Sequence, residues 1–313
     1  MGDPAGIGLD IVLLASQSRV GLPHFLLIAD PQAVAQRAAA LGVGSDKLAI
    51  LPITCSAPVN PGRPDPANAA ATIRSIEIAC ELARRGEASA VVTNPIAKHV
   101  LTSARFAHPG HTEFLGELAL RYWGATTEPV MMLAAPELRV VLATIHVALS
   151  RVPGMLSQDL IARTARTTLA ALTRDFGIAK PRLAVCGLNP HAGENGLMGT
   201  EDDAIIRPAV ALLAAEGHDV KGPYPPDTLF HAAARAKYDA AFAMYHDQGL
   251  IPLKTLAFDH GVNVTLGLPF VRTSPDHGTA FDIAATGKAS PASFIAAMRL
   301  AADMAARRRG QVE

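Results

Sequence analysis

The segment RLAVCGL (residues 182–188) is followed by the helical pattern EDDAIIRPAVALLAAE (residues 201–216) and then by a second apolar run, AAFAMYH (residues 240–246). A short apolar run, a longer helical stretch and another short apolar run predict a strand, a crossover helix and a parallel strand. Strands joined in this way form a largely parallel sheet that helices cover on both faces. This segment therefore predicts an α/β fold.

The same alternation continues along nearly the whole chain. Further strands are expected at residues 24–30, 47–53, 89–94, 130–134, 138–146 and 262–268. Further helices are expected at residues 9–19, 31–41, 68–85, 112–122, 155–176 and 289–307. Residues 131–133 and 140–143, which Pro136 and Glu137 separate, predict a local antiparallel ribbon. The length of 313 residues favours about two domains or one large α/β unit.

Composition excludes several classes of partner. The 28 Lys and Arg residues balance 28 Asp and Glu residues, and a formal net charge of +0 argues against nucleic acid. Cys55, Cys80 and Cys186 lie far apart without a C-x-x-C pair, so a disulfide framework is not expected and a reducing cytoplasm is the natural compartment. No apolar run approaches the ~20 residues that span a bilayer, and the first residues do not resemble a signal peptide.

Three histidines, His146, His191 and His246, each follow an apolar strand pattern. Ligands of parallel α/β sheets bind beyond the carboxyl ends of the strands, so three imidazoles could meet there on one ion. Three neutral imidazoles with an open position suit Zn²⁺; Co²⁺ and Ni²⁺ are possible, and Mg²⁺ fits less well by ligand type. A single histidine of this kind is more often an ordinary rim or core residue, and spacing does not establish that the three converge.

A second set of polar residues is Lys254, Asn263 and Arg272, each nine positions from the last. They flank the predicted strand at residues 262–268. An ammonium group, an amide and a planar guanidinium together suit a phosphate or a carboxylate. Three unrelated surface residues are the alternative that the sequence leaves open.

Glycine-rich and histidine-rich segments precede several helices. GDPAGIG (residues 2–8) leads into a helix and HGTAFD (residues 277–282) begins another element; such amides can cradle phosphate, although glycine turns are usually only turns. NPIAK (residues 94–98) follows a predicted strand. HPGHTE (residues 108–113) precedes a helix, where Thr112 would serve as the N-cap and His111 would point toward the rim of the histidines.

Together these segments resemble the 4-hydroxythreonine-4-phosphate dehydrogenase family of the vitamin B6 pathway. The resemblance runs from residue 1 to about residue 300, and its longest stretches are LNPHAGENGLMGTE (residues 188–201), MYHDQG (residues 244–249) and NVTLGLPFVRTSPDHGTAFDI (residues 263–283). It implies a fold like that of isocitrate and isopropylmalate dehydrogenases, with two α/β lobes and a cleft between them. Residues 1–115 with 265–313 would form the cofactor-side domain, and residues 116–264 the metal- and dimer-forming domain.

The resemblance also assigns roles to residues. The divalent-metal ligands would be His146, His191 and His246, with one of them contributed by the partner subunit of a homodimer whose active site lies at the interface. The substrate-binding residues would be His111, Thr112, Lys254, Asn263 and Arg272. The cofactor contacts would be Lys98, His277, Gly278 and Thr279. The candidates for the substrate amino group are Asp227 and Asp247, whose alternative roles are a helix cap and a hydrogen bond to a metal histidine.

The activity that this resemblance implies is NAD(P)-dependent oxidation of 4-phosphooxy-L-threonine to 2-amino-3-oxo-4-phosphooxybutanoate. That product decarboxylates to 3-amino-2-oxopropyl phosphate in pyridoxine 5'-phosphate biosynthesis. The alternatives are a paralogous 4-phospho-threonate or 4-phospho-erythronate dehydrogenase and, from another class, a three-histidine metal-dependent hydrolase. The sequence does not decide between NAD and NADP. Members of the family usually carry a short apolar strand before the GDPAGIG loop, and we expect that strand to be absent from this chain.

Overall fold

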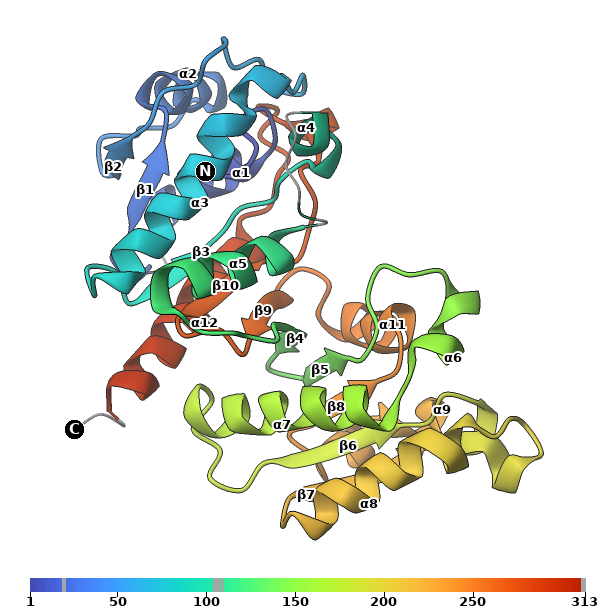
Figure 1. Cartoon of the computed structure of the whole chain (residues 1–313). Helices are drawn as coiled ribbons and strands as arrows, with labels where there is room; N and C mark the ends of the chain where they lie inside the picture. Colours follow the sequence, from blue (N-terminus) through green and yellow to red (C-terminus); the bar gives the residue numbers. More distant parts are fainter. Residues whose placement is uncertain (19–20, 104–107, 109, 311–313) are drawn as a thin grey trace. The chain divides into compact units, whose positions relative to one another are not determined.

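The structure, a computed structural model, describes residues 1–18, 21–103, 108 and 110–310. The chain forms two compact units: unit 1 comprises Met1–Thr127 and Leu268–Ala305, and unit 2 comprises Glu128–Gly267 and Ala306–Glu313. It thus leaves unit 1 and later returns to it (Figure 1). Helix α5 (His111–Trp123) lies wholly in unit 1, so a boundary at residue 115 would cut through it.

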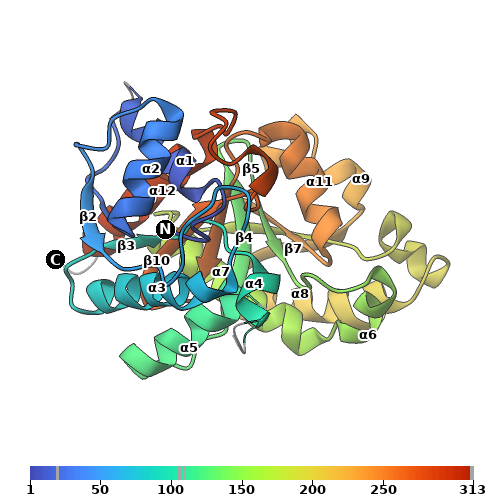
Figure 2. The ribbon, with the colours of Figure 1, turned by 90° about the horizontal axis from the view of Figure 1, so that it is seen from above.

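Unit 1 contains two pairs of parallel strands. β1 (Leu26–Ala29) pairs with β2 (Ala49–Pro52), and β3 (Ala90–Val92) pairs with β10 (Val271–Pro275). The helices are α1 (Gly8–Gln17), α2 (Pro31–Leu41), α3 (Ala69–Arg84), α4 (Lys98–Ser103), α5 and most of α12 (Ala292–Arg309). One apolar core joins α1, α2 and β1, and another joins α3, α5 and β3. Figure 2 shows α1 and α2 side by side.

Helix α2 illustrates how local signals set the limits of an element. The carboxylate of Asp30 accepts hydrogen bonds from the backbone N–H groups of Gln32 and Ala33, which would otherwise lack partners. Pro31 follows at the first helical position, where its missing N–H costs nothing. Gly42 ends the helix with a left-handed φ of 66°. The predicted range of residues 31–41 is therefore confirmed.

A pocket of about 520 Å³ lies in unit 1, and its lining includes residues of both β1 and β3. Within the described part of the chain these two strands do not pair with each other. The α-ammonium group of Met1 lies in the same lining and donates a hydrogen bond to the carbonyl oxygen of Ile28 at 3.0 Å. Burial lowers the pKa of this ammonium group to about 5. The expectation about a strand before the GDPAGIG loop stays a prediction.

Unit 2 is built on a sheet with the strand order β9-β4-β5-β8-β6-β7. Strands β5, β8, β6 and β7 run parallel, and β4 runs antiparallel to both β5 and β9. The bounds of the strands are β4 (Val130–Ala135), β5 (Leu138–Leu142), β6 (Arg182–Cys186), β7 (Asp219–Tyr224), β8 (Ala240–Ala243) and β9 (Val262–Leu266). The β4–β5 pair confirms the predicted antiparallel ribbon, and the mostly parallel α/β sheet confirms the predicted fold class.

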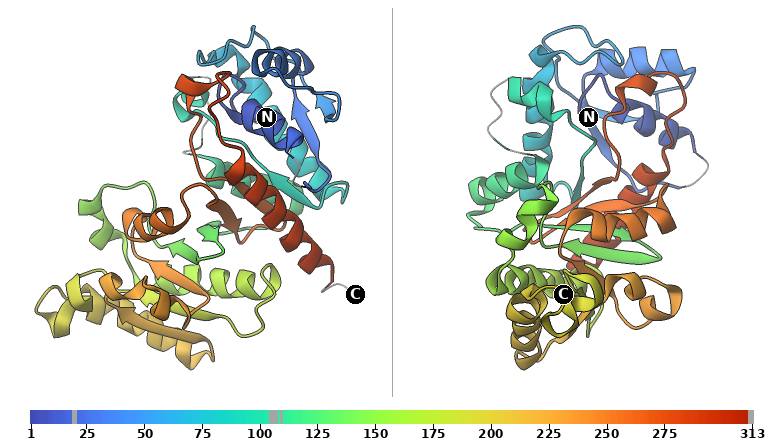
Figure 3. Two further views of the ribbon diagram at one scale, coloured as in Figure 1. Left: turned by 180° about the vertical axis from the view of Figure 1, so that it is seen from behind. Right: turned by 90° about the vertical axis from the view of Figure 1, so that its right-hand side faces the viewer.

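The helices of unit 2 cover this sheet. α7 (Gln158–Arg174) packs against α8 (Arg207–Ala215), and a single π-helical turn, Asp202–Ile206, precedes α8. α11 (His246–Ala257) packs against β5 and β8 (Figure 3). Within the described part of the chain, no helix is long and apolar enough to cross a membrane.

Several elements differ from the sequence expectations. β7 and β10 were not predicted, because their polar residues and prolines hide the strand pattern. α11 was not predicted, because it contains Gly249 and Pro252. The strands predicted at residues 138–146 and 240–246 end earlier, at Leu142 and Ala243. The histidines that follow therefore lie outside the sheet, beyond its carboxyl edge.

Candidate functional site

Two of the predicted metal ligands lie together in unit 2. His146 follows β5 in a loop and has a positive φ of 50°, whereas His246 is the first residue of α11, just after β8. Because β5 and β8 are neighbouring parallel strands, both side chains start from the same edge of the sheet. The ring centroids are 5.6 Å apart, with an interplanar angle of 43°. The sequence analysis expected the residues that follow parallel strands to meet beyond the carboxyl ends of these strands. This expectation is confirmed for the proximity of His146 and His246.

The third histidine does not complete a site within this chain. His191 is exposed and lies in the turn Pro190–Gly196, which follows β6. Five successive residues of this turn, from His191 to Asn195, have positive φ values between 42° and 81°, a conformation that costs energy for every residue except glycine. Within the described part of the chain, no three His, Cys, Asp or Glu side chains gather as a metal site.

Asp247 contacts one imidazole of the pair. Its Oδ1 lies 2.7 Å from Nδ1 of His246, so the carboxylate can orient the ring and leave Nε2 as the donor toward an ion. This is the alternative role that the sequence suggested for Asp247. Two imidazoles at this separation, one of them held by a carboxylate, form a donor set that suits a borderline-soft divalent metal.

Two buried polar residues next to these histidines escaped the sequence prediction. The hydroxyl of Thr144 donates to the carbonyl oxygen of Met244 at 2.8 Å. The side-chain amide of Gln248 accepts from the N–H of Met244 at 2.7 Å and donates to the carbonyl oxygen of Gly187 at 2.8 Å. The only available signal was a polar residue just after an apolar strand and another within MYHDQG.

The predicted phosphate set is divided between the two units. Lys254 lies on α11 and its Nζ is 5.7 Å from the ring centroid of Phe258. Asn263 lies within β9 rather than beside it, opposite Leu133 of β4. Arg272, in contrast, belongs to β10 in unit 1. The nine-residue spacing therefore corresponds to three different elements.

Arg272 belongs to a cationic cluster in unit 1, defined as Arg272, Lys98 and His111. Its side chain is buried, with 3% exposed, and its Nη2 donates to the hydroxyl of Thr93 at 2.7 Å. Burial lowers the pKa of Arg272 to about 10, so it still carries its charge near neutral pH. Lys98 begins α4 and His111 begins α5. The positive charges of Arg272 and Lys98 both act on His111, and a Cβ on Gly110, next to His111, would lie 3.5 Å from Nζ of Lys98.

His111 is the neutral member of this cluster. Its Nε2 is shielded from solvent and has no hydrogen-bond partner among the described residues. Burial, followed by the positive charges of Arg272, the N-terminus and Lys98, lowers its pKa well below the ordinary value of 6.5. An imidazole that stays neutral beside an arginine and a lysine can donate one hydrogen bond to an anion. This cluster therefore has the charge and the unsatisfied polar atom that an anionic group would require.

Two expected capping roles are wrong. Helix α5 starts at His111 after Gly110, so Thr112 lies inside the first turn and is not the N-cap. The short helix α9 (Pro226–Leu229) starts after Pro225, and Asp227 is an exposed residue of its first turn rather than its cap. In both cases the helix begins one or more residues earlier than the capping pattern suggested.

The first glycine segment contacts protein backbone. The N–H of Ile7 donates to the carbonyl oxygen of Thr279 at 2.9 Å, and the N–H of Asp3 donates to that of Pro95. A Cβ on Gly6 would lie only 2.9 Å from the Thr279 oxygen, so glycine is needed for this approach. Because residues 1–10 are buried, their amides do not form an open phosphate cradle. The interpretation of GDPAGIG as a structural turn is the correct one.

The segment His277–Thr279 is more open. Nδ1 of His277 lies 3.0 Å from the carbonyl oxygen of Gly278, and its buried Nε2 has no hydrogen-bond partner in the described ranges. A Cβ on Gly278 would meet no atom within 4 Å. This backbone can therefore be approached closely by a bound molecule.

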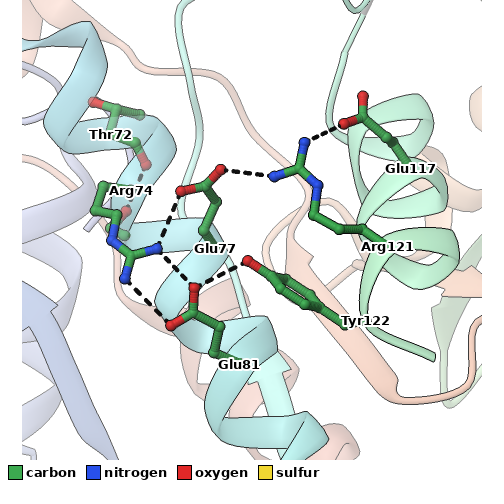
Figure 4. A network of polar contacts seen from close by, with 8 residues as sticks. Thr72, Arg74, Glu77, Glu81, Glu117, Arg121 and Tyr122 are labelled. Atoms are coloured by element: carbon green, nitrogen blue, oxygen red, sulfur yellow. Dashed lines mark hydrogen bonds and ion pairs between the residues drawn. The ribbon is translucent and has the colours of Figure 1, made fainter.

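Charged residues on α3 and α5 hold these two helices together (Figure 4). Glu77 contacts Arg74 at 3.2 Å and Arg121 at 3.3 Å, and Glu81 accepts hydrogen bonds from Arg74 and from the hydroxyl of Tyr122. The network lies at the surface, so water and salt weaken it. Its contribution is to support α5, the helix that begins with His111.

Comparisons with known proteins agree on one family. The family model described as "Pyridoxal phosphate biosynthetic protein PdxA" matches residues 13–301. A relative from Methylorubrum populi named 4-hydroxythreonine-4-phosphate dehydrogenase is 56% identical over 98% of this chain and 93% of its own length. A relative of the same name from Xanthobacter autotrophicus is 51% identical over 97% of this chain and 92% of its own length.

Solved structures match the fold over nearly the whole chain. The crystal structure of 4-hydroxythreonine-4-phosphate dehydrogenase from Klebsiella pneumoniae matches with a TM-score of 0.87 and 38% identity, covering 97% of this chain and 96% of that one. A terephthalate 1,2-cis-dihydrodiol dehydrogenase from Burkholderia xenovorans LB400 matches with a TM-score of 0.64 and 29% identity, covering 96% of each chain.

Proposed function

The chain belongs to the family of the pyridoxal phosphate biosynthetic protein PdxA, whose members are dehydrogenases, and from this premise we propose its reaction. The substrate is 4-phosphooxy-L-threonine, and the enzyme oxidises its secondary alcohol at C3. The hydroxyl proton leaves, and the C3–H electron pair passes as hydride to the nicotinamide ring of NAD⁺ or NADP⁺. The product, 2-amino-3-oxo-4-phosphooxybutanoate, loses CO₂ to give 3-amino-2-oxopropyl phosphate for pyridoxine 5'-phosphate synthesis.

The observation that carries this proposal is the cationic cluster of unit 1. Arg272 is buried and charged, Lys98 and His111 lie near it, and His111 presents a shielded Nε2 without a partner among the described residues. A phosphomonoester would satisfy these groups, since guanidinium groups bind phosphate oxygens with two parallel hydrogen bonds. The family resemblance supports Thr112, Lys254 and Asn263 as further substrate contacts.

His146 and His246 are proposed to bind a divalent metal. Their ring separation and the contact of Asp247 with His246 support this role, and Zn²⁺ fits imidazole ligands best, with Co²⁺ or Mg²⁺ as alternatives. When bound, such an ion would lower the pKa of the substrate hydroxyl and stabilise negative charge on its oxygen. The third ligand is proposed to be His191 of a second copy of the chain, because His191 does not join the pair within one chain.

Exposed apolar side chains support a homodimer. Ile251 of α11 is 65% exposed, Phe258, which directly follows α11, is 73% exposed, and Leu197, next to the turn that carries His191, is 83% exposed. Large exposed apolar side chains suit a protein–protein interface. In the proposed homodimer a second copy covers these side chains and supplies its own His191 to the histidine pair.

The nicotinamide cofactor is proposed to bind near His277, Gly278 and Thr279, with Lys98 as a further contact. The open space beside Gly278 and the shielded Nε2 of His277 support this placement. Asp227 is exposed and remains a proposed contact for the substrate amino group, whereas Asp247 already contacts His246. A cytoplasmic enzyme without nucleic-acid or membrane partners is consistent with this role.

A paralogous activity on 4-phospho-threonate or 4-phospho-erythronate is the second candidate. It uses the same phosphate-binding residues and differs only where a hydroxyl replaces the substrate amino group. Asp247 contacts His246 through Oδ1 alone, and a carboxylate accepts a hydrogen bond from a hydroxyl as well as from an ammonium group, so Asp227 and Asp247 do not decide between the two substrates.

A substrate panel tests the proposal. Each phosphorylated acid is incubated with NAD⁺ or NADP⁺, with and without a chelator, and the absorbance of the reduced nicotinamide is followed. We expect turnover of 4-phosphooxy-L-threonine that the chelator abolishes and Zn²⁺ or Co²⁺ restores. Turnover only of the threonate or erythronate would establish the paralogous activity. Phosphate release without a nicotinamide would instead identify a hydrolase.

A further inference from the structure

Three loops that carry histidines begin at adjacent strands of unit 2. In the order of the sheet, β5 leads to His146, β8 leads to His246 and β6 leads to His191. The ladders end close to these loops: the last paired residues are Leu142 with Ala243 in one ladder and Val185 with Phe242 in the other, and the N–H of Ala143 still donates to the carbonyl oxygen of Ala243 at 2.9 Å. Beyond these residues the sheet no longer fixes the spacing between the loops.

A short chain of buried side-chain hydrogen bonds continues where the sheet ends. Thr144 donates to the carbonyl oxygen of Met244, whose N–H donates to Gln248, and Gln248 in turn donates to the carbonyl oxygen of Gly187. These three bonds are 2.7–2.8 Å long. Thr144, Met244 and Gln248 are 3%, 0% and 8% exposed. Both backbone groups of Met244 are thus satisfied away from water, as buried backbone groups require.

The bonds connect all three loops near their histidines. Thr144 precedes His146 by two residues, Met244 precedes His246 by two residues, and Gly187 precedes His191 by four. We propose that Thr144 and Gln248 are positioning residues for metal binding: they hold the segments of His146 and His246 together for one site, and they fix the base of the loop whose His191 serves the site of a second copy. This inference rests on the proposed role of the histidines as metal ligands.

Two tight contacts make this arrangement stiff. A Cβ on Gly249 would lie 2.4 Å from Cγ1 of Val140 and 2.8 Å from Cδ2 of Leu142, so α11 packs directly on β5 next to Gln248. On the other side, a Cβ on Gly187 would lie 2.7 Å from Oδ1 of Asp202. The Gln248 side chain therefore lies between elements that have little room to move.

Asp202 extends the arrangement toward His191. Its carboxylate is fully buried and accepts hydrogen bonds from the N–H groups of Leu188 at 2.8 Å and Asn189 at 3.1 Å. The strained turn with His191 starts immediately after these two residues. Asp202 thus holds the two residues that join Gly187 to the turn with His191. A displacement of Gly187 would therefore also displace the His191 imidazole.

The test uses two nearly isosteric substitutions and one rescue. Thr144→Val removes the hydroxyl donor and keeps the shape, whereas Thr144→Ser keeps the hydroxyl. Gln248→Glu keeps the acceptor for Met244 and removes the donor to Gly187. The affinity of the full-length protein for Co²⁺ is measured by calorimetry, and the visible absorption of the bound Co²⁺ reports the ligand geometry. Thermal unfolding without metal is measured in parallel.

We expect Thr144→Val and Gln248→Glu to weaken Co²⁺ binding about 10- to 100-fold, the usual cost of losing a group that holds a metal ligand in place. The Co²⁺ spectrum should change as well, and Thr144→Ser should bind within about twofold of the unaltered protein. The inference is overturned if both variants keep the original affinity and spectrum, even when they unfold at a lower temperature.

One further variant separates the two proposals. His246→Ala removes a proposed ligand and leaves Thr144 and Gln248 in place. If it binds Co²⁺ as the unaltered protein does, the metal role of the histidines fails, and the positioning role fails with it. If it loses binding while Thr144→Val and Gln248→Glu keep it, only the positioning role fails.

Discussion

The histidine loops of unit 2 are tied together by hydrogen bonds between neutral groups, whereas the glycine loop of unit 1 is tied by a buried ion pair. In unit 2, the side chains of Thr144 and Gln248 connect the loops through three hydrogen bonds. In unit 1, Arg37 donates to the carbonyl oxygens of Gly6 and Pro4 and pairs with the carboxylate of Asp10.

The ion pair also contacts the loop of unit 1 that contains Ala285. The other oxygen of Asp10 accepts a hydrogen bond from the N–H of Ala285 at 2.7 Å, and Asp10 and Arg37 are 0% and 2% exposed. Losing one neutral bond leaves the others in place. Losing one buried charge, however, leaves its partner without compensation in a site that excludes water. The comparison therefore predicts that the two regions respond very differently to single substitutions.

The largest effect is expected for Asp10→Asn. This change leaves the Arg37 guanidinium buried without its counter-charge, and the free energy of unfolding should fall by about 3–5 kcal/mol. Urea denaturation followed by circular dichroism measures the loss. Arg85→Met is the matched control, because it breaks an exposed pair with Glu87 and should cost less than about 1 kcal/mol. Equal losses in the two variants would show that burial of the charges does not matter.

The fold was largely predictable because its signals are local. Apolar runs marked β4, β5, β6, β8 and β9, and the sequence Asp30-Pro31 with Gly42 defined helix α2. The missed elements lack such signals: α11 contains a proline, and β7 carries Asp219 and Lys221 at the edge of its sheet. There, pairing with a neighbouring strand or packing on the sheet overrides the local preference.

The site was predictable only in part. His146 and His246 could be assigned because each follows an apolar strand, and the family resemblance supplied residues such as Arg272. Thr144 and Gln248 could not be found in this way, because their roles depend on which three strands are neighbours in the sheet. The ion pair between Asp10 and Arg37 likewise joins residues that are 27 positions apart, and no sequence motif predicts it.

The packing beneath the unit 2 hydrogen bonds provides the second prediction. Gly249→Ala places a methyl group against Val140 and Leu142 and should lower the free energy of unfolding by about 1–3 kcal/mol through overpacking. Gly154→Ala is the matched control in a helix, where an added Cβ meets no atom within 4 Å and should stabilise by about 0.4–1 kcal/mol. A stabilising Gly249→Ala would mean that α11 can shift away from β5.

The third prediction concerns the pH dependence of stability that His111 causes in the cationic cluster of unit 1. The pKa of His111 lies well below 6.5 in the folded chain, because burial and Arg272 disfavour its protonated form. As the pH falls below about 6.5, the unfolded chain takes up a proton that the folded chain does not. Stability from this residue is therefore present above pH 6.5 and is lost on acidification, by at most about 1.4 kcal/mol for each pH unit.

His111→Gln removes the titrating group and tests this contribution. The difference in unfolding free energy between the variant and the unaltered protein should be constant above pH 7 and should change in favour of the variant between pH 6.5 and pH 5.5. A difference that does not depend on pH over this range would show that His111 takes up its proton equally in both states.

The smallest effect is expected at the exposed charges between α3 and α5. Glu77→Gln removes the carboxylate that contacts both Arg74 and Arg121 (Figure 4), and it should lower the free energy of unfolding by about 0.2–1 kcal/mol at low salt. In 1 M NaCl, where the screening length is about 3 Å, the loss should vanish. Asp10→Asn should keep most of its cost in the same salt, since its partner is buried. If the loss of unfolding free energy in Glu77→Gln persists at high salt, the exposed network resists screening as the buried pair does, and the contrast between the two is wrong.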